Sequence, residues 1–464
     1  MRLPRLSIVL LALGGCSLAP DYAPPATPVA GAYREAGPWV VATPQDAAPR
    51  GDWWRRFGDP MLDDLEARLD RASPTLAAAL ARYDAARAQN GLANAALFPS
   101  ITGTAQINEN RLSATRPLGT ASVAYTDRIV GLSASYEADL WGRVRATASA
   151  SKAEAQASKA DLASVRLSLQ AQLADSYFAL RADDAQIALL QQTVEAYRRA
   201  WELTDARHSG GISSGLDINR AETQLADARA LLDREWIERS VAEHAIAALL
   251  GVPAPDFSLA PAAASTGQMP PIPAGTPSQL LQRRPDIAAA ERRMAAANAR
   301  IGVARAGFFP LLTLGAGGGF ESTTASLLHA PNGFWALGPA AAALPLFDAG
   351  ANLARLRGAH AGFAEASADY RATVLAGFAD VEDNLARLHR LGDGTSDQRQ
   401  AAEAARRTSD LALIRYRDGA SDYLEVVTAQ TAALDAEMTL ITLRMQQQQA
   451  NVDLIRALGG DFEP

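Results

Sequence analysis

The feature that most constrains the fold is an internal duplication, because the second half of the chain repeats the first at a fixed distance. Residues from Gly142 to Gly251 align with residues from Gly350 to Gly459 without a gap, always 208 positions apart. Matching positions include Glu195/Glu403, Arg207/Arg415, Gly211/Gly419, Ser213/Ser421 and Leu216/Leu424. An ungapped register over about 110 residues indicates that one structural unit is used twice.

Each copy contains one very long helical stretch and a shorter one. No proline interrupts residues 142–207 or 350–415. Apolar residues recur there at coiled-coil spacing: Leu173, Leu180, Ile187, Val194 and Trp201 in the first copy, and Val374, Phe378, Val381, Leu385 and Leu388 in the second. About 65 residues at 1.5 Å each predict a helix roughly 100 Å long. A second helix, over about 214–250 and 421–458, follows a glycine-containing turn in each copy and predicts antiparallel helical pairs.

Two segments in each half of the chain, before the long helical stretch, change to a period of two and predict β-strands, at about 97–110, 128–141, 309–321 and 334–347. In the first, Ile101, Gly103, Ala105 and Ile107 alternate with polar residues. Strands of about ten residues, apolar on one face, are typical of transmembrane barrels, although a soluble sheet gives the same pattern. Four strands cannot close a barrel, so the barrel interpretation requires that several chains share one barrel. The glycine run from Gly315 to Gly319 lacks the spacing of a nucleotide-binding loop and reads as part of a strand.

Residues 211–215 match G-x-S-x-G, the pattern around a hydrolase nucleophile. That motif needs a strand before the serine, but Ser213 lies between two helical stretches. The second copy reads Gly419-Ala420-Ser421-Asp422-Tyr423 and has lost the second glycine. The segment therefore predicts a helix–helix turn, with a glycine at positive φ and a serine that caps the next helix.

The single cysteine, Cys16, excludes an internal disulfide and a thiolate zinc site. Arg2 and Arg5 precede an apolar run, and Leu13-Gly14-Gly15 leads into Cys16. This order is typical of a secretory signal that ends in a lipidation site, so residues 1–15 are interpreted as a signal peptide and Cys16 as the acylated N-terminus. Serine at position 17, rather than aspartate, favours the outer membrane.

Charge, histidine spacing and hydropathy argue against a nucleic-acid-binding protein, a metal or cofactor site and a transmembrane helix. A net charge of −7 does not favour a nucleic-acid partner. The five histidines are scattered without ligand spacing, so neither a metal nor another cofactor is expected. Beyond the signal no run of 18 apolar residues predicts a transmembrane helix.

The chain resembles the TolC/OprM-like outer-membrane efflux factors, in their lipoprotein (NodT-type) branch. The resemblance rests on "GCSLAPDYAPP", "WWRRFGDPMLDDLEARL", "LLQRRPDIAAAERRMAAANARIGVARAGFFPLLTL" and the two turn sequences. It implies an α+β membrane protein in which three chains form a twelve-stranded β-barrel and a periplasmic α-helical barrel, with a mixed equatorial domain. The implied segments are a Pro-rich lipid-anchored tether (16–50), two repeats (51–251 and 285–459), an equatorial linker (252–284) and a C-terminal tail (460–464).

The resemblance also implies function: a passive, non-enzymatic exit duct of a tripartite pump for drugs or other small toxic compounds. Its partners would be two further copies, a periplasmic adaptor, an inner-membrane RND-type pump and outer-membrane lipid. Residues implied at the periplasmic constriction are Leu424, Glu425, Asp422, Thr428 and Tyr416; those implied at the adaptor contact are Gly211, Ser213, Leu216, Gly419 and Ser421. Thr428 stands where TolC has an aspartate, which weakens the expectation of a second acidic ring. Two alternatives remain open, the duct of a type I protein-secretion system and a coiled-coil lipoprotein without a pore.

Overall fold

The computed structural model describes residues 18–23, 51–115, 121–262 and 283–460. The chain divides into two compact units. The first unit holds residues 1–26, 82–159 and 289–371, and the second holds residues 27–81, 160–288 and 372–464. Four helices contribute residues to both units: α2 (Pro74–Ala95), α3 (Arg143–Ser209), α6 (Pro285–Ala306) and α7 (Ala351–Arg417).

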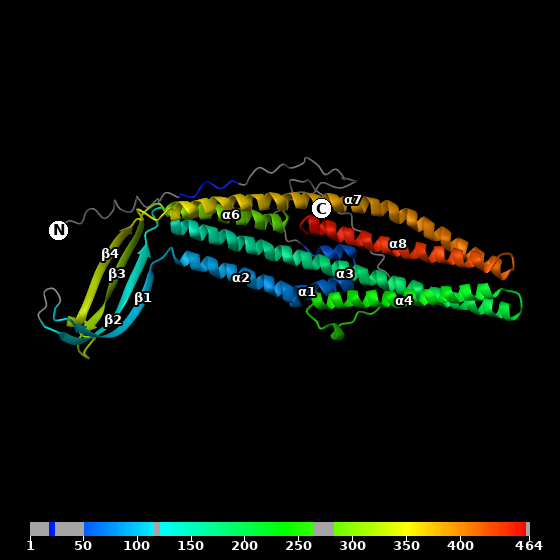
Figure 1. Ribbon diagram of the computed structural model, residues 1–464, viewed down its shortest axis with the longest axis horizontal. Helices are drawn as coiled ribbons and strands as arrows, with labels where there is room; N and C mark the ends of the chain where they lie inside the picture. The colour runs from blue at the N-terminus through cyan, green and yellow to red at the C-terminus, as the bar shows by residue number, and fades with distance from the viewer. Residues whose placement is uncertain (1–17, 24–50, 116–120, 263–282, 461–464) are drawn as a thin grey trace. The chain divides into compact units, whose positions relative to one another are not determined.

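The first unit contains one antiparallel sheet with the strands in sequence order (Figure 1). Its strands are β1 (Ser100–Leu112), β2 (Val123–Glu137), β3 (Leu311–Ser322) and β4 (Gly333–Ala343). The β2–β3 pairing joins the two halves of the duplication, with Gly131 opposite Gly319. Each half therefore contributes a strand pair, as the duplicated pattern predicted.

One face of the sheet is apolar. Residues that pair directly across neighbouring strands lie on the same face, so the pairing identifies its members. Leu132 pairs with Gly103 and Gly318, and Gly318 pairs in turn with Trp335. Large apolar side chains on this face are exposed in the single chain: Ile101 at 73%, Leu132 at 62%, Trp335 at 78% and Leu337 at 82%. Water alone does not favour such a surface, so it needs an apolar environment or a partner.

The glycine run belongs to β3, as expected. At Gly319 a Cβ atom would lie 2.2 Å from the carbonyl oxygen of Val130 and 2.5 Å from the Cα of Gly131. Any side chain at this position would therefore force β2 and β3 apart. The glycines serve close strand packing rather than phosphate binding.

Two strands end earlier than the sequence predicted. β2 ends at Glu137 rather than near 141, because Asp139 accepts hydrogen bonds from the backbone N–H groups of Val144 (3.0 Å) and Arg145 (2.9 Å) and so caps α3. Trp141, assigned to the strand, instead donates from Nε1 to the carbonyl of Pro310 at 2.9 Å. β4 ends at Ala343 rather than 347, and Asp348 caps α7 in the same way as Asp139 caps α3.

The long helices reproduce the duplication residue by residue. Helices α3 and α7 each have 67 residues, and α4 (Gly215–Leu249) and α8 (Tyr423–Ala457) each have 35. In the second unit α4 folds back beside α3 and α8 beside α7, forming hairpin 1 (α3–α4) and hairpin 2 (α7–α8) (Figure 1). Among the described residues, no helix has a stretch long and apolar enough to cross a membrane.

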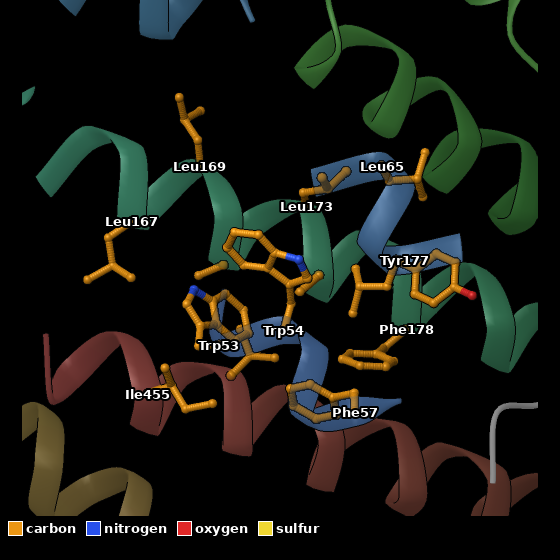
Figure 2. Packing of buried hydrophobic residues seen from close by; sticks show 14 of the residues in the cluster. Trp53, Trp54, Phe57, Leu65, Leu167, Leu169, Leu173, Tyr177, Phe178 and Ile455 are labelled. Carbon is orange, nitrogen blue, oxygen red and sulfur yellow. The ribbon is translucent and has the colours of Figure 1, made fainter. Parts of the chain in front are cut away.

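The core of the second unit forms around the segment that precedes and includes α1 (Pro60–Ala72). Trp53, Trp54 and Phe57, in a short 3-10 helix (Trp53–Phe57), pack against Tyr177 and Phe178 of α3 (Figure 2). Further buried members come from α1, α7 and α8: Leu62, Leu65, Leu69, Val381, Leu385, Val452 and Ile455. The predicted heptad positions Leu173 and Leu180 are completely buried in this cluster. The heptad therefore does more than pair two helices, because it also seats the aromatic segment.

A buried ion network holds the start of the linker that follows α4. Asp184 of α3 accepts from Arg181 (2.8 Å) and from Arg239 of α4 (2.7 Å). Arg239 also donates to the carbonyl of Leu259 at 2.6 Å, and Asp184 accepts from the backbone N–H of Ala262 at 3.2 Å. Both arginines and Asp184 are buried, so each charge is compensated by an opposite charge and by backbone groups.

Candidate functional site: the turns of the two helical hairpins

The two hairpins end in turns with the same backbone. Gly211 and Gly419 both adopt a φ of 76°, in the left-handed region that favours glycine. The backbone N–H of Ile212 donates to Arg207 and that of Ala420 to Arg415, each at 2.8 Å. No atom lies within 4 Å of a Cβ built on either glycine. The requirement for glycine therefore comes from backbone conformation, as predicted, and not from lack of space.

The helix caps differ from the prediction. Ser214, not Ser213, caps α4 in a capping box with Asp217, and Asp422, not Ser421, caps α8 by accepting from the N–H of Glu425 at 3.1 Å. The cap is the residue directly before the helix, whose extended backbone aims its side chain at the free N–H groups.

The two turn serines lie one residue too early to cap. Ser213 Oγ turns back and donates to the carbonyl of Thr204 at 3.1 Å. Ser421 Oγ is buried and has no hydrogen-bond partner in the described part of the chain. Helix α3 rather than a strand precedes Ser213, so the G-x-S-x-G match is not a nucleophile elbow.

The turns of the two hairpins contact each other through Arg207. Its guanidinium donates to the carbonyls of Tyr416 (2.7 Å) and Arg417 (2.9 Å) and lies over the Tyr416 ring, 4.6 Å from its centre. Arg415, the equivalent residue in the second copy, instead pairs with Glu425 of its own hairpin at 3.0 Å. One duplicated arginine therefore joins the hairpins and the other offsets an acidic side chain. The repeat alignment singled out both residues, but their roles did not follow from it.

A small buried cluster supports this contact. Tyr416 and Tyr423 pack edge-on, with ring centres 5.2 Å apart, against Ala200, Ala221 and Val426. Farther along the hairpins, buried Gln224 donates to buried Gln430 across the same interface at 3.2 Å. Tyr416, expected at the constriction, is only 4% exposed, so its ring fills the interface between hairpins rather than an open surface.

The remaining expected constriction residues lie on the surface at the start of α8. Leu424, Glu425 and Thr428 are exposed, Leu424 at 45%. Leu216, the counterpart of Leu424 in hairpin 1, is exposed at 58%, next to exposed Ile212. Both turns thus present an apolar side chain to solvent. Within the described stretches, no three or more His, Cys, Asp or Glu side chains are grouped to hold a metal ion.

The family model for outer membrane efflux proteins matches the chain twice, over residues 68–252 and 276–460. The two matches begin and end 208 residues apart, the same offset as the internal repeat. The family unit is therefore the duplicated unit, and this chain contains both copies.

Individual relatives are similar to this chain over almost its whole length. The toluene efflux pump outer membrane protein TtgC of Pseudomonas putida is 33% identical, covering 98% of this chain and 95% of the relative. The pyoverdine export outer membrane protein OpmQ of Pseudomonas putida is 34% identical, covering 100% and 99%. The solved outer-membrane channel OprN superposes with a TM-score of 0.88 at 30% identity, covering 97% of this chain and 100% of OprN. The chain belongs to the outer membrane efflux protein family and is an efflux channel of the outer membrane.

Proposed function

We propose that the chain is the exit duct of a tripartite efflux pump, which passively conducts small toxic compounds received from a periplasmic adaptor and an inner-membrane RND-type pump. In this proposal the protein performs no catalysis and the pump supplies the energy. The observation that carries the proposal is the open sheet: its apolar face is exposed, and within the described residues β1 and β4 pair on one side only.

Three copies of the chain would complete the sheet. The edges of β1 and β4 offer unpaired backbone groups that another copy can satisfy. Since each copy brings four strands, three copies give a closed sheet of twelve, with its apolar face toward lipid. Acylation of Cys16, which lies outside the described residues, would add a second attachment to the membrane.

The turn of hairpin 2 would form the periplasmic constriction. Leu424 is the candidate for its narrowest ring, because an exposed leucine on each of three copies can narrow the bore and exclude water. Glu425 and Asp422 would supply negative charge around it, with Thr428 one turn further along α8. The pairing of Arg415 with Glu425 reduces the net charge of that ring, and so apolar closure by Leu424 is the main barrier.

The turn of hairpin 1 would contribute the adaptor contact together with the turn of hairpin 2. Gly211, Ser213, Gly419 and Ser421 set the shape of the two turns, while Leu216 offers apolar area for burial. Tyr416 would act by positioning, since it holds the hairpins together from inside.

The cargo would be selected mainly by the pump. TtgC and OpmQ are named for toluene and for pyoverdine, two very different compounds, yet this chain is 33% and 34% identical to them. Overall similarity among ducts therefore does not follow the cargo.

Conductance through planar lipid bilayers tests the proposal. Without residues 1–15, the purified protein should run in mild detergent at slightly less than three times 48.9 kDa after correction for bound detergent, and it should form a small, mostly closed channel. Leu424→Ala should raise the conductance several-fold, because a narrower side chain widens the constriction. The matched control Leu216→Ala, at the equivalent position of hairpin 1, should leave it unchanged. A monomer without channel activity would refute the duct, and equal effects of both variants would refute the place of the constriction.

A further inference from the structure

The described N-terminal residues lie along helix α6 in the first unit. Asn298 donates from Nδ2 to the carbonyl of Pro20 at 2.8 Å. Arg305 donates to the carbonyl of Leu18 at 3.3 Å, and Tyr22 donates from its hydroxyl to the carbonyl of Glu291 at 3.3 Å. Early residues of the segment therefore meet the end of α6 and later residues meet its start, so the segment runs antiparallel to the helix.

Gly302 allows the segment to approach. A Cβ atom on this glycine would lie 2.7 Å from the Cβ of Ala19, 2.9 Å from its Cα and 3.1 Å from its backbone nitrogen. Two of these atoms belong to the backbone, so no side-chain rotation can relieve the clash. Gly302 is helical and needs no positive φ, and glycine inside a helix is less favourable than alanine. The contact with Ala19 gives a physical reason for a residue that the helix itself disfavours.

These contacts come from one face of α6. Glu291, Asn298, Gly302 and Arg305 are separated by seven, four and three residues, the spacing of a single helical stripe. Asn298 is 6% exposed, and its amide donates to the carbonyl of Pro20 from the segment. A buried amide requires a partner, so the stripe is built around the segment that covers it.

We propose that this face of α6 is a docking surface for the chain's own N-terminal segment, and that docking sets where the lipid on Cys16 enters the membrane. The second part rests on the acylation proposed above. Cys16 precedes Leu18 by two residues, and a chain spans at most about 3.6 Å per residue. Leu18 is held beside Arg305, and the lipidated residue Cys16 can lie no more than about 7 Å from Leu18. Without docking, the 35 residues 16–50 would set its range instead.

Chymotrypsin cleavage after Tyr22 measures docking, because the released peptide is the lipid-bearing N-terminus and its rate of release reports how often Tyr22 leaves α6. Tyr22 is partly buried at this docking surface, and burial raises the pKa of its hydroxyl to about 12. Purified trimer in detergent would be digested and the peptide quantified by mass spectrometry. Gly302→Leu should accelerate release at least about tenfold, since tenfold corresponds to about 1.4 kcal/mol and three hydrogen bonds are lost.

Two further variants make the result specific. Ala19→Leu creates the same clash from the segment and leaves α6 unchanged, so it should accelerate release to a similar extent even if Gly302→Leu folds poorly. Gly358→Leu, in α7, is the matched control, because no atom lies within 4 Å of a Cβ at that glycine. It should release the peptide at the wild-type rate.

The outcomes separate docking from acylation. A lipidated peptide that is released slowly from the wild type and Gly358→Leu, but rapidly from the other two, supports both parts. A lipidated peptide released at one rate from all four proteins overturns the docking surface and leaves the anchor intact. A wild-type peptide without lipid overturns the acylation and with it the anchoring role of the docking surface.

Discussion

Replacing Asp175 with asparagine should stabilise the protein at pH 8 and have no effect at pH 4. Asp175 lies on α3 facing α8, and its Oδ1 is buried without a hydrogen-bond partner among the described residues. Burial, together with the nearby negative charge of Asp453, raises the pKa of the Asp175 carboxyl to about 7, although Arg456 opposes this rise. Asparagine has the same shape and no charge, so it removes the cost of ionisation alone.

The sign and size follow from proton linkage. The unfolded chain releases this proton near pH 3.9, while the folded chain holds it to about pH 7. Stability therefore falls as pH rises between about 4 and 7, and the full cost applies above that window. The difference between a folded pKa of about 7 and an unfolded pKa of about 3.9 corresponds to a ceiling of about 4 kcal/mol per chain. Local relaxation and water entry reduce the ceiling, and a gain of about 1–3 kcal/mol is expected.

Thermal unfolding at pH 4, 6 and 8, followed by far-UV circular dichroism, measures the effect. An unfolding entropy of about 2 cal/mol/K per residue makes 1 kcal/mol equivalent to roughly 1 °C for a chain of this length, so Asp175→Asn should melt about 1–3 °C higher at pH 8. Asp233→Asn, on the exposed side of α4, is the control and should change little at any pH. An equal gain at pH 4 and pH 8 would refute the reasoning, because the charge would then not be its cause.

Three further predictions concern the acylation site and the turn of hairpin 2. Cys16→Ala should abolish incorporation of labelled palmitate, and label retained by this variant would exclude Cys16 as the acylation site. Gly419→Val should reduce drug resistance in an export-deficient host, because a β-branched residue is strained at a φ of 76°; resistance equal to the wild type would show that the turn of hairpin 2 tolerates distortion. Glu425→Gln should weaken block of the channel by divalent cations, but only modestly because Arg415 already pairs with Glu425; unchanged block would assign the cation site to other residues.

The sequence predicted the regular parts of the fold well because they repeat. Helices α3 and α7 begin and end within about two residues of the expected limits, since an uninterrupted heptad pattern and a glycine turn define both ends. Strand ends were less accurate. An aspartate such as Asp139 stops β2 by capping the following helix, and strand alternation continues in the sequence past the point where the ladder has ended.

Contacts between distant segments could not be predicted from local patterns. The ion network of Asp184 and Arg239 joins residues 55 positions apart, and Asn298 binds a carbonyl 278 positions away. Neither spacing has a periodic signature. The prediction of the helix-capping residues failed for a different reason. A serine within a turn is compatible with several positions, and only the backbone conformation decides which residue directly precedes the helix.

Duplication also explains why the two turns share a backbone but not a role. Both copies retain the glycine and an exposed leucine: the turn of hairpin 1 presents Leu216 and the turn of hairpin 2 presents Leu424. The arginines differ because their surroundings differ: Arg207 meets the carbonyls of hairpin 2, whereas Arg415 meets Glu425, whose counterpart in the first copy is Asp217. Asp217 is engaged in the capping box of Ser214, which leaves Arg207 available to join the hairpins. The two turns therefore differ in their contacts: Arg207 links hairpin 1 to hairpin 2, whereas Arg415 pairs with Glu425 inside hairpin 2.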